Sequence, residues 1–152
     1  MEYHIYSDGS CINNGLPSAI ASWSYLVTDS KGNVIEACTG KIKGPQNSNR
    51  AELVAFIKSL GFVARTDRRS TFVIHVDYEA IYLYCNGKSN PKSNLDLYKE
   101  INRKLLQCKD REIEVVKVKA HTAGDSLKEF LNDTVDSLAK KTCLLFKKQL
   151  AN

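Results

Sequence analysis

Four acidic residues stand out because each falls where predicted elements of secondary structure meet. Asp8 and Asp77 directly follow β-rich runs, Glu52 lies near the start of a predicted helix, and Asp136 flanks the apolar stripe of another. In an open α/β sheet, sites form beyond the strand ends, so carboxylates that end neighbouring strands can lie side by side. Carboxylates placed so close together repel one another unless cations lie between them. Hard oxygen ligands without cysteines or paired histidines suit Mg²⁺ or Mn²⁺ rather than zinc.

Each of these residues also has a simpler structural interpretation. Asp8 begins an Asp-Gly dipeptide that is typical of turns, and Asp77 could cap the short helix predicted after it. Glu52 lies three residues after Asn49, which is the spacing of a capping box at a helix start. Asp136 could be an ordinary surface acid. The functional hypothesis therefore rests on the four residues together.

Three other residues deserve an assignment. His121 lies in a loop after a predicted strand, where it could move a proton or simply be solvated. His75 lies inside a strand, which favours a histidine satisfied within the sheet. Trp23 lies in another strand and is expected to pack on the sheet or in the core.

The hydrophobic pattern predicts the elements that must position these residues. Strands are expected at 3–7, 19–28, 34–42, 71–76 and 113–118, and helices at 49–64, 78–84, 95–106 and 126–146. The early hairpin implies antiparallel pairing, and the later alternation of strands with helices implies parallel pairing. The sequence therefore predicts an α/β protein with a mixed sheet and helices on its faces. We expect residues 1–152 to form a single domain, because no repeat or linker interrupts the pattern.

Composition narrows the class of protein. Of the 152 residues, 43% are apolar and 26% are charged, which excludes a disordered chain, collagen or a coiled coil. No apolar run approaches the ~20 residues of a membrane helix, so no membrane association is expected. Five scattered cysteines without a CxxC pair argue against a disulfide framework and indicate a reducing, cytoplasmic location. The net charge of +5 is compatible with a nucleic-acid partner.

Four motifs resemble those of the type 1 ribonuclease H family. They are YSDGSC at 6–11, NSNRAEL at 47–53, VD at 76–77, and VKVKAH at 116–121 followed by NDTVDSLA at 132–139. They occur in the family's order, and each falls on its expected element. The resemblance covers the chain from Tyr3 to about Lys141. It implies the ribonuclease H-like fold, a five-stranded mixed sheet whose first three strands are antiparallel, with helices on both faces.

The resemblance also implies an activity. The family hydrolyses the RNA strand of RNA–DNA hybrids and leaves 5′-phosphate and 3′-hydroxyl ends. Carried over by position, Asp8, Glu52, Asp77 and Asp136 would hold two Mg²⁺ ions, with Mn²⁺ as a substitute, and His121 would aid proton transfer or product departure. Two cations can clamp the attacking water and the leaving oxygen of an in-line displacement. We expect a monomeric endonuclease whose partner is the hybrid.

Substrate recognition is expected from small polar residues near the acidic group and from nearby lysines. The former could read the 2′-hydroxyl that distinguishes RNA from DNA, and the latter could contact phosphates. The expected contacts are Ser10, Cys11, Asn13, Asn47, Ser48, Asn49, Lys88 and Lys92.

Two departures from the family pattern keep alternatives open. The segment after Asp77 lacks the basic, tryptophan-rich handle of many bacterial members, and Glu79 stands where glutamine is common. A domain without the handle could bind hybrids with weak or no catalysis. A resolvase-type DNA nuclease of the same fold is the other alternative, since such enzymes would share Asp8 and Asp77.

Overall fold

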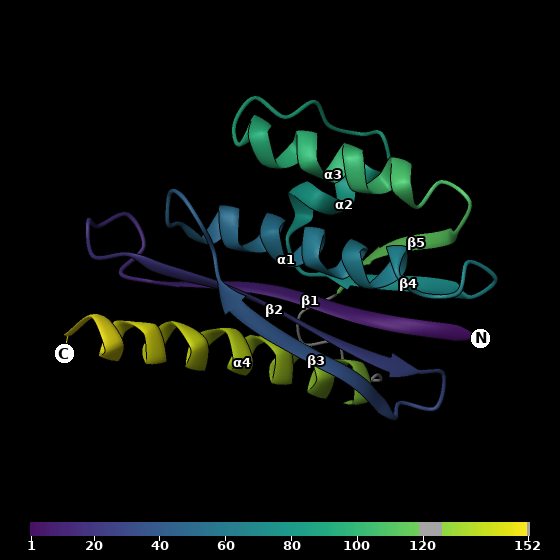
Figure 1. Ribbon diagram of the computed structural model, residues 1–152, viewed down its shortest axis with the longest axis horizontal. Coiled ribbons are helices and arrows are strands. Elements are labelled where there is room, and N and C mark those ends of the chain that lie inside the picture. Colours follow the sequence, from purple (N-terminus) through teal and green to yellow (C-terminus); the bar gives the residue numbers. More distant parts are fainter. Residues whose placement is uncertain (119–125, 152) are drawn as a thin grey trace.

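The computed structural model describes residues 1–118 and 126–151, whose strands form one mixed sheet (Figure 1). The strands are β1 (Glu2–Ile12), β2 (Ile20–Asp29), β3 (Val34–Lys41), β4 (Thr71–Val76) and β5 (Glu112–Lys117). The helices are α1 (Ser48–Ala64), α2 (Glu79–Cys85), α3 (Leu95–Gln107) and α4 (Ser126–Ala151). The sheet order is β3-β2-β1-β4-β5, with the first three strands antiparallel and β1, β4 and β5 parallel. The predicted fold class and strand directions are confirmed.

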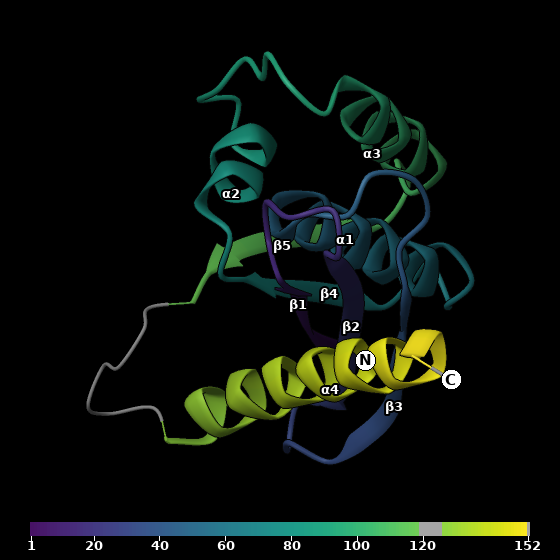
Figure 2. The ribbon, with the colours of Figure 1, turned by 90° about the vertical axis from the view of Figure 1, so that its left-hand side faces the viewer.

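Helices cover the sheet unequally. Figures 1 and 2 show α1, α2 and α3 on one face and α4 alone on the other. The larger core lies under α1, where Leu53, Phe56 and Leu60 are fully buried against strand residues such as Ile5 and Ile74. Apolar burial of this kind is the main favourable term in folding, so α1 is firmly fixed relative to β1.

A smaller core fixes α4 to the opposite face. Tyr6 and Leu26 of the sheet pack on Leu131 and Val135 of α4. The hydroxyl of Ser24 donates to the carbonyl oxygen of Val135 at 2.7 Å, which adds a polar tie to the apolar contact. The register of α4 on the sheet is therefore set by both kinds of contact.

Two alternatives for the acidic residues are wrong. β1 continues through Gly9 to Ile12, because β2 pairs with it along its whole length up to the Ile12–Ile20 pair. Asp8 thus lies inside a strand and not in a turn. Asp77 does not cap α2, whose N-cap residue is Tyr78 and makes no side-chain capping bond.

The start of α1 also differs from the prediction. Its N-cap is Asn47 and not Asn49: the Asn47 side chain accepts the Arg50 backbone N–H, with Oδ1 and N separated by 2.8 Å. An asparagine side chain satisfies the free amides only from the residue just before the helix, so Asn47 excludes Asn49 from this role. Glu52 lies beyond capping-box range of Asn47, which removes its structural alternative.

The last helix is longer than expected. It reaches Ala151, past the expected end at 146. Among the described residues, no helix, α4 included, is both long enough and apolar enough to cross a membrane.

His75 and Trp23 have the packing roles predicted for them. His75 is buried, its Nε2 lies 2.9 Å from Nδ1 of His4, and its ring stacks on Tyr6. Trp23 lies over Gly40, where a Cβ atom would come within 2.8 Å of the indole ring. Both residues therefore serve the sheet, and neither needs a catalytic explanation.

Candidate active site

The parallel pairing of β1 and β4 brings the first two acidic residues together. Ser7 is paired with Val76 at the end of β4, so Asp8 and Asp77 are the next residues on adjacent strands. Asp8 is 5% exposed, whereas Asp77 is exposed to solvent where the chain leaves the sheet. One carboxylate is therefore fixed in the protein interior and its neighbour faces the solvent.

A glycine contact brings Glu52 to the same place. A Cβ atom on Gly9 would lie 2.3 Å from the carbonyl carbon of Ala51 and 2.4 Å from the backbone nitrogen of Glu52. Only glycine permits this approach of β1 and α1. The Gly9 backbone N–H donates to Oδ1 of Asp8 at 3.0 Å and also hydrogen-bonds the Glu52 carboxylate. The glycine therefore positions both acidic side chains.

Alternation along β1 turns Asp8 toward α4. Tyr6 packs on α4, and successive side chains of a strand point to opposite faces, so Asp8 lies on the same face as Tyr6. Asp136 directly follows the buried Val135 and hydrogen-bonds the Asp8 carboxyl group. Oδ2 of Asp136 also lies 2.8 Å from Nζ of Lys140, one turn further along α4.

Asp8, Glu52, Asp77 and Asp136, here called the carboxylate cluster, carry excess negative charge. Burial, and then the charge of Glu52, raises the pKa of Asp8 far above its ordinary value. Burial also raises the pKa of Glu52, and repulsion from Asp77 and Asp136 adds to this. Burial pushes the pKa of Asp136 upward, but hydrogen bonds with Asp8 and Lys140 outweigh it and leave the pKa lowered. A proton on Asp8 thus relieves the repulsion.

The donor set of the carboxylate cluster fits a divalent metal. Four carboxylates from separate elements are the hard oxygen ligands that Mg²⁺ and Mn²⁺ prefer. A bound cation would relieve the repulsion that otherwise keeps a proton on the buried Asp8. Among residues 1–118 and 126–151, no three acidic, histidine or cysteine side chains already converge on one point in metal-binding geometry.

The turn after β1 and the start of α1 are joined beside the carboxylate cluster. Nδ2 of Asn14 donates to Oγ of Ser48 at 3.1 Å, and the Ser48 backbone N–H donates to Oδ1 of Asn14 at 3.3 Å. Asn13 adopts the left-handed conformation in this turn, and Asn49 is exposed. The Asn47 side chain is already engaged as the helix cap. The structure thus brings together the two segments expected to contact substrate.

The remaining predicted contacts are dispersed. Ser10 is buried and its carbonyl oxygen accepts from Sγ of Cys143, while Cys11 is half-buried. Lys88 and Lys92 are exposed between α2 and α3, in a segment separate from the carboxylate cluster. His121 lies outside the described residues.

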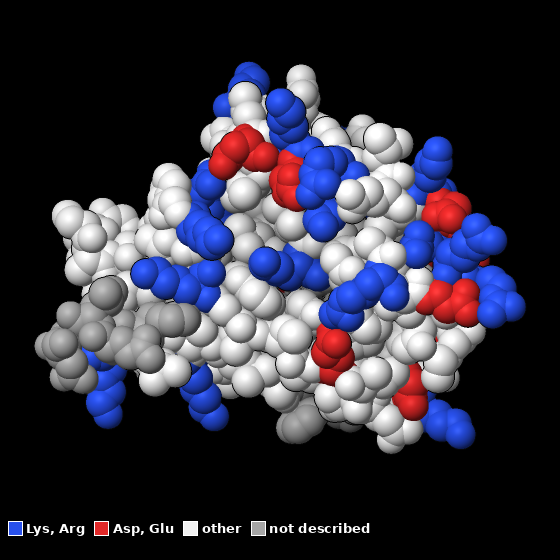
Figure 3. Space-filling view, in the orientation of Figure 1, with Lys and Arg blue, Asp and Glu red and all other residues white. Residues whose placement is uncertain are grey.

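Further surface features adjoin the cluster. A groove of 1040 Å³ begins at Asp77 and runs between α2 and β5 as far as Leu105 of α3. On the face seen in Figure 3, most of the surface is uncharged, and scattered lysine and arginine side chains are more common than acidic ones. Such a surface favours contact with phosphates without reading base sequence.

Three residues of the site were missed by the sequence reasoning. Gly9 belongs to the Asp-Gly dipeptide and to the motif at 6–11, but nothing in the sequence shows that α1 lies against it. Asn14 belongs to a loop whose partner is distant in sequence. Lys140 pairs with Asp136, and the i,i+4 spacing of the two residues is a sequence signal that could have found this ion pair.

The chain matches the sequence profile of the RNase H family over residues 1–144. Ribonuclease H of one Campylobacter jejuni strain is 29% identical over 149 residues, covering 92% of this chain and 90% of the relative. Ribonuclease HI of another strain gives the same values.

Solved structures show the same fold. LC11-RNase H1, crystallised in complex with an RNA/DNA hybrid, superposes with a TM-score of 0.73 at 20% identity, covering 93% of this chain and 96% of that one. The N-terminal RNase H domain of a Mycobacterium tuberculosis protein gives a TM-score of 0.77 at 19% identity, covering 99% of each chain. The fold and the profile match define the class, a ribonuclease H-like α/β protein. The chain belongs to the RNase H family.

Proposed function

We propose that this protein is an endoribonuclease that hydrolyses the RNA strand of RNA–DNA hybrids with two divalent metal ions. The products would carry 5′-phosphate and 3′-hydroxyl ends. The observation that carries the proposal is the meeting of Asp8, Glu52, Asp77 and Asp136 from four separate elements in a chain of the RNase H family. The crystallised complex of LC11-RNase H1 with an RNA/DNA hybrid supports the choice of substrate.

The carboxylates have distinct tasks in this proposal. Asp8, Glu52, Asp77 and Asp136 would hold two Mg²⁺ ions, or Mn²⁺ in their place. When bound, the ions supply an activated water and neutralise the leaving 3′ oxygen. Asp8 and Glu52, held by the Gly9 amide and by burial, fix the inner part of the site. Asp77 and Asp136 are more accessible and can adjust when substrate arrives.

Other residues of the chain bind and orient the hybrid. The joined segments around Asn14 and Ser48 present polar groups beside the carboxylate cluster, where the RNA 2′-hydroxyl can be read. Lys88 and Lys92 would contact phosphates of the strand that is not cut. His121 would move a proton at the reacting oxygen or assist departure of the product, which suits an imidazole near its reference pKa of ~6.5.

The test uses RNA labelled at its 5′ end and annealed to DNA, with Mg²⁺ or Mn²⁺. The wild-type protein should cut this RNA and spare single-stranded RNA, duplex RNA and duplex DNA. Asp77→Asn should abolish cutting, whereas Asp67→Asn, at the opposite end of β4, should leave it unchanged. Fragments with 3′-hydroxyl ends migrate differently from those of alkaline hydrolysis and can be extended by a polymerase.

Three outcomes would overturn the proposal. Binding of the hybrid that weakens with salt, without any cleavage, would favour a hybrid-binding module. Cleavage of branched DNA with the hybrid left intact would favour a resolvase-type nuclease. Equal cutting by wild type and Asp77→Asn would separate the activity from the carboxylate cluster.

A further inference from the structure

Lys140 is the cation paired directly with the carboxylate cluster in the described part of the chain. Its Nζ lies 2.8 Å from Oδ2 of Asp136, and both groups lie on α4 one turn apart. It also interacts electrostatically with Asp8, the buried member of the cluster. Lys140 thus offsets part of the negative charge of the carboxylate cluster when no metal is bound.

From this geometry we propose that Lys140 is a tethered competitor of the divalent metal and sets the metal concentration at which the site is occupied. This inference rests on the proposed function, because it takes Asp136 as a metal ligand. An oxygen of Asp136 that accepts a hydrogen bond from Lys140 is less available to an ion. Metal binding must then break this ion pair, and the cost weakens the apparent affinity.

The position of α4 holds Asp136 where the pair with Lys140 can form. Val135 is fully buried and its carbonyl oxygen accepts from Ser24, so the neighbouring Asp136 has little freedom of backbone movement. The i,i+4 spacing with the acid N-terminal to the base is the favourable order on a helix. The Lys140 side chain is 63% exposed and Asp136 is 37% exposed, so the pair can open into solvent without burying a charge.

Lys140 has a matched control in its neighbour. Lys141 is an exposed residue of the same type on the same helix, and successive residues of a helix point about 100° apart. Removing Lys141 changes the net charge of the protein by the same amount as removing Lys140. A difference between the two variants therefore reports the contact with Asp136 and not the general electrostatic field.

The experiment is calorimetric titration of Mn²⁺ and Mg²⁺ into the full-length protein without nucleic acid, at low ionic strength. Lys140→Met should bind the metal about two- to fivefold more tightly, which is the range expected for an exposed ion pair. Lys141→Met and the charge-conserving Lys140→Arg should bind like the wild type. In cleavage assays, Lys140→Met should reach half-maximal rate at a correspondingly lower metal concentration.

The outcomes separate this inference from the proposed function. Equal or weaker metal binding by Lys140→Met would overturn the role of Lys140, even if the wild type cuts the hybrid. Equal tightening in Lys140→Met and Lys141→Met would reduce the effect to net charge and would also overturn it. Tighter binding by Lys140→Met alone supports it, even if the wild type fails to cut the hybrid, in which case only the proposed activity would be lost.

Discussion

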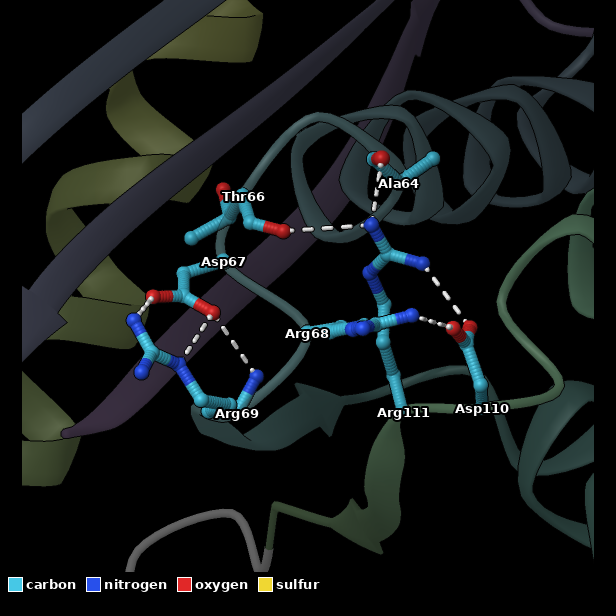
Figure 4. A network of polar contacts seen from close by, with 7 residues as sticks. All are labelled: Ala64, Thr66, Asp67, Arg68, Arg69, Asp110 and Arg111. Atoms are coloured by element: carbon cyan, nitrogen blue, oxygen red, sulfur yellow. Dashed lines mark hydrogen bonds and ion pairs between the residues drawn. The ribbon is translucent and has the colours of Figure 1, made fainter.

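Two charged regions of this molecule differ in how their acidic side chains are paired. The arginine network, formed by Asp67, Arg68, Arg69, Asp110 and Arg111, joins the turn before β4 to the turn before β5 (Figure 4). Each of its acids faces an arginine: Asp67 pairs with Arg69 at 3.0 Å, and Asp110 pairs with Arg111 at 3.0 Å. The carboxylate cluster instead places acids against one another.

The difference is visible in the direction of the pKa shifts. Hydrogen bonds from Arg69 lower the pKa of Asp67 to about 2. Burial and the nearby Glu52 raise that of Asp8. A region whose charges are satisfied within the chain stabilises the fold, whereas one that is left with excess charge is suited to a ligand of opposite sign. Charge balance thus separates the arginine network from the candidate active site.

Asp8→Asn should have the largest effect and should change activity and stability in opposite directions. In the proposed mechanism Asp8 holds the metal, so its loss would remove several kcal/mol of transition-state stabilisation and the rate should fall by about a thousandfold or more. In the metal-free wild type at pH 7, folding must place a proton on Asp8, because burial and the neighbouring acids raise its pKa far above its ordinary value. Asparagine avoids this cost, so the free energy of unfolding should rise by at least ~1 kcal/mol. The asparagine Oδ1 can still accept the Gly9 amide. Hybrid cleavage and urea unfolding in EDTA measure the two effects.

Asp67→Asn is the matched control for this prediction. It removes an acid of the same size from the arginine network, where the charge is compensated. Cleavage should be unchanged and stability should not rise. The comparison fails if Asp8→Asn is less stable than the wild type in EDTA, because the carboxylate cluster would then not be a repulsive site.

Much of the fold and part of the site follow from local sequence. The sequence predicts Thr71–Val76 to the residue, because the run consists of β-branched and aromatic side chains and ends at the charged Asp77. The mixed sheet followed from the order of strands and helices. Local pattern, however, did not locate the end of β1: the strand continues because β2 pairs with it beyond Asp8.

One unpredicted feature is local: Asn47 and Asn49 are both residues that can cap a helix, and Asn47 is the one that accepts the Arg50 backbone N–H. The others depend on contacts between distant segments. The need for glycine at position 9 arises only when α1 lies against β1. The link between Asn14 and Ser48 joins residues 34 positions apart. Sequence patterns identify the acidic residues, but their geometry is set by packing.

Arg111→Met, in the arginine network, should lower the stability of the protein and leave its cleavage activity nearly unchanged. Arg111 is 14% exposed at its side chain, and its guanidinium donates to the carbonyl oxygens of Ala64 and Thr66 at 2.8 and 3.2 Å, which closes the end of α1. Losing these charged donors should cost about 2–3 kcal/mol of unfolding free energy. The cleavage rate of the folded protein should stay within about twofold, because the carboxylate cluster keeps its contacts.

Arg68→Met provides the contrast within the same network. Arg68 is 74% exposed and lies 3.9 Å from the same Asp110. An exposed ion pair of this kind contributes little, so unfolding free energy should change by less than ~0.5 kcal/mol. Equal destabilisation by the two variants, measured by urea unfolding, would show that the contacts of Arg111 with the end of α1 are unimportant.

Stability should depend on pH in opposite senses in the two regions. The pKa of Asp67 is about 2 in the folded protein and 3.8 ordinarily, so its pairing with Arg69 stabilises the fold above pH 3.8. This contribution is lost as pH falls toward 2, and the melting temperatures of wild type and Asp67→Asn should converge there. The pKa of Asp8 is raised in the folded protein. The melting temperature of Asp8→Asn should therefore exceed that of the wild type by an amount that grows as the pH rises above the ordinary pKa of an aspartate. Thermal unfolding in EDTA across this range measures both differences. Parallel pH trends for the two variants would contradict the assignment of one region to structure and the other to function.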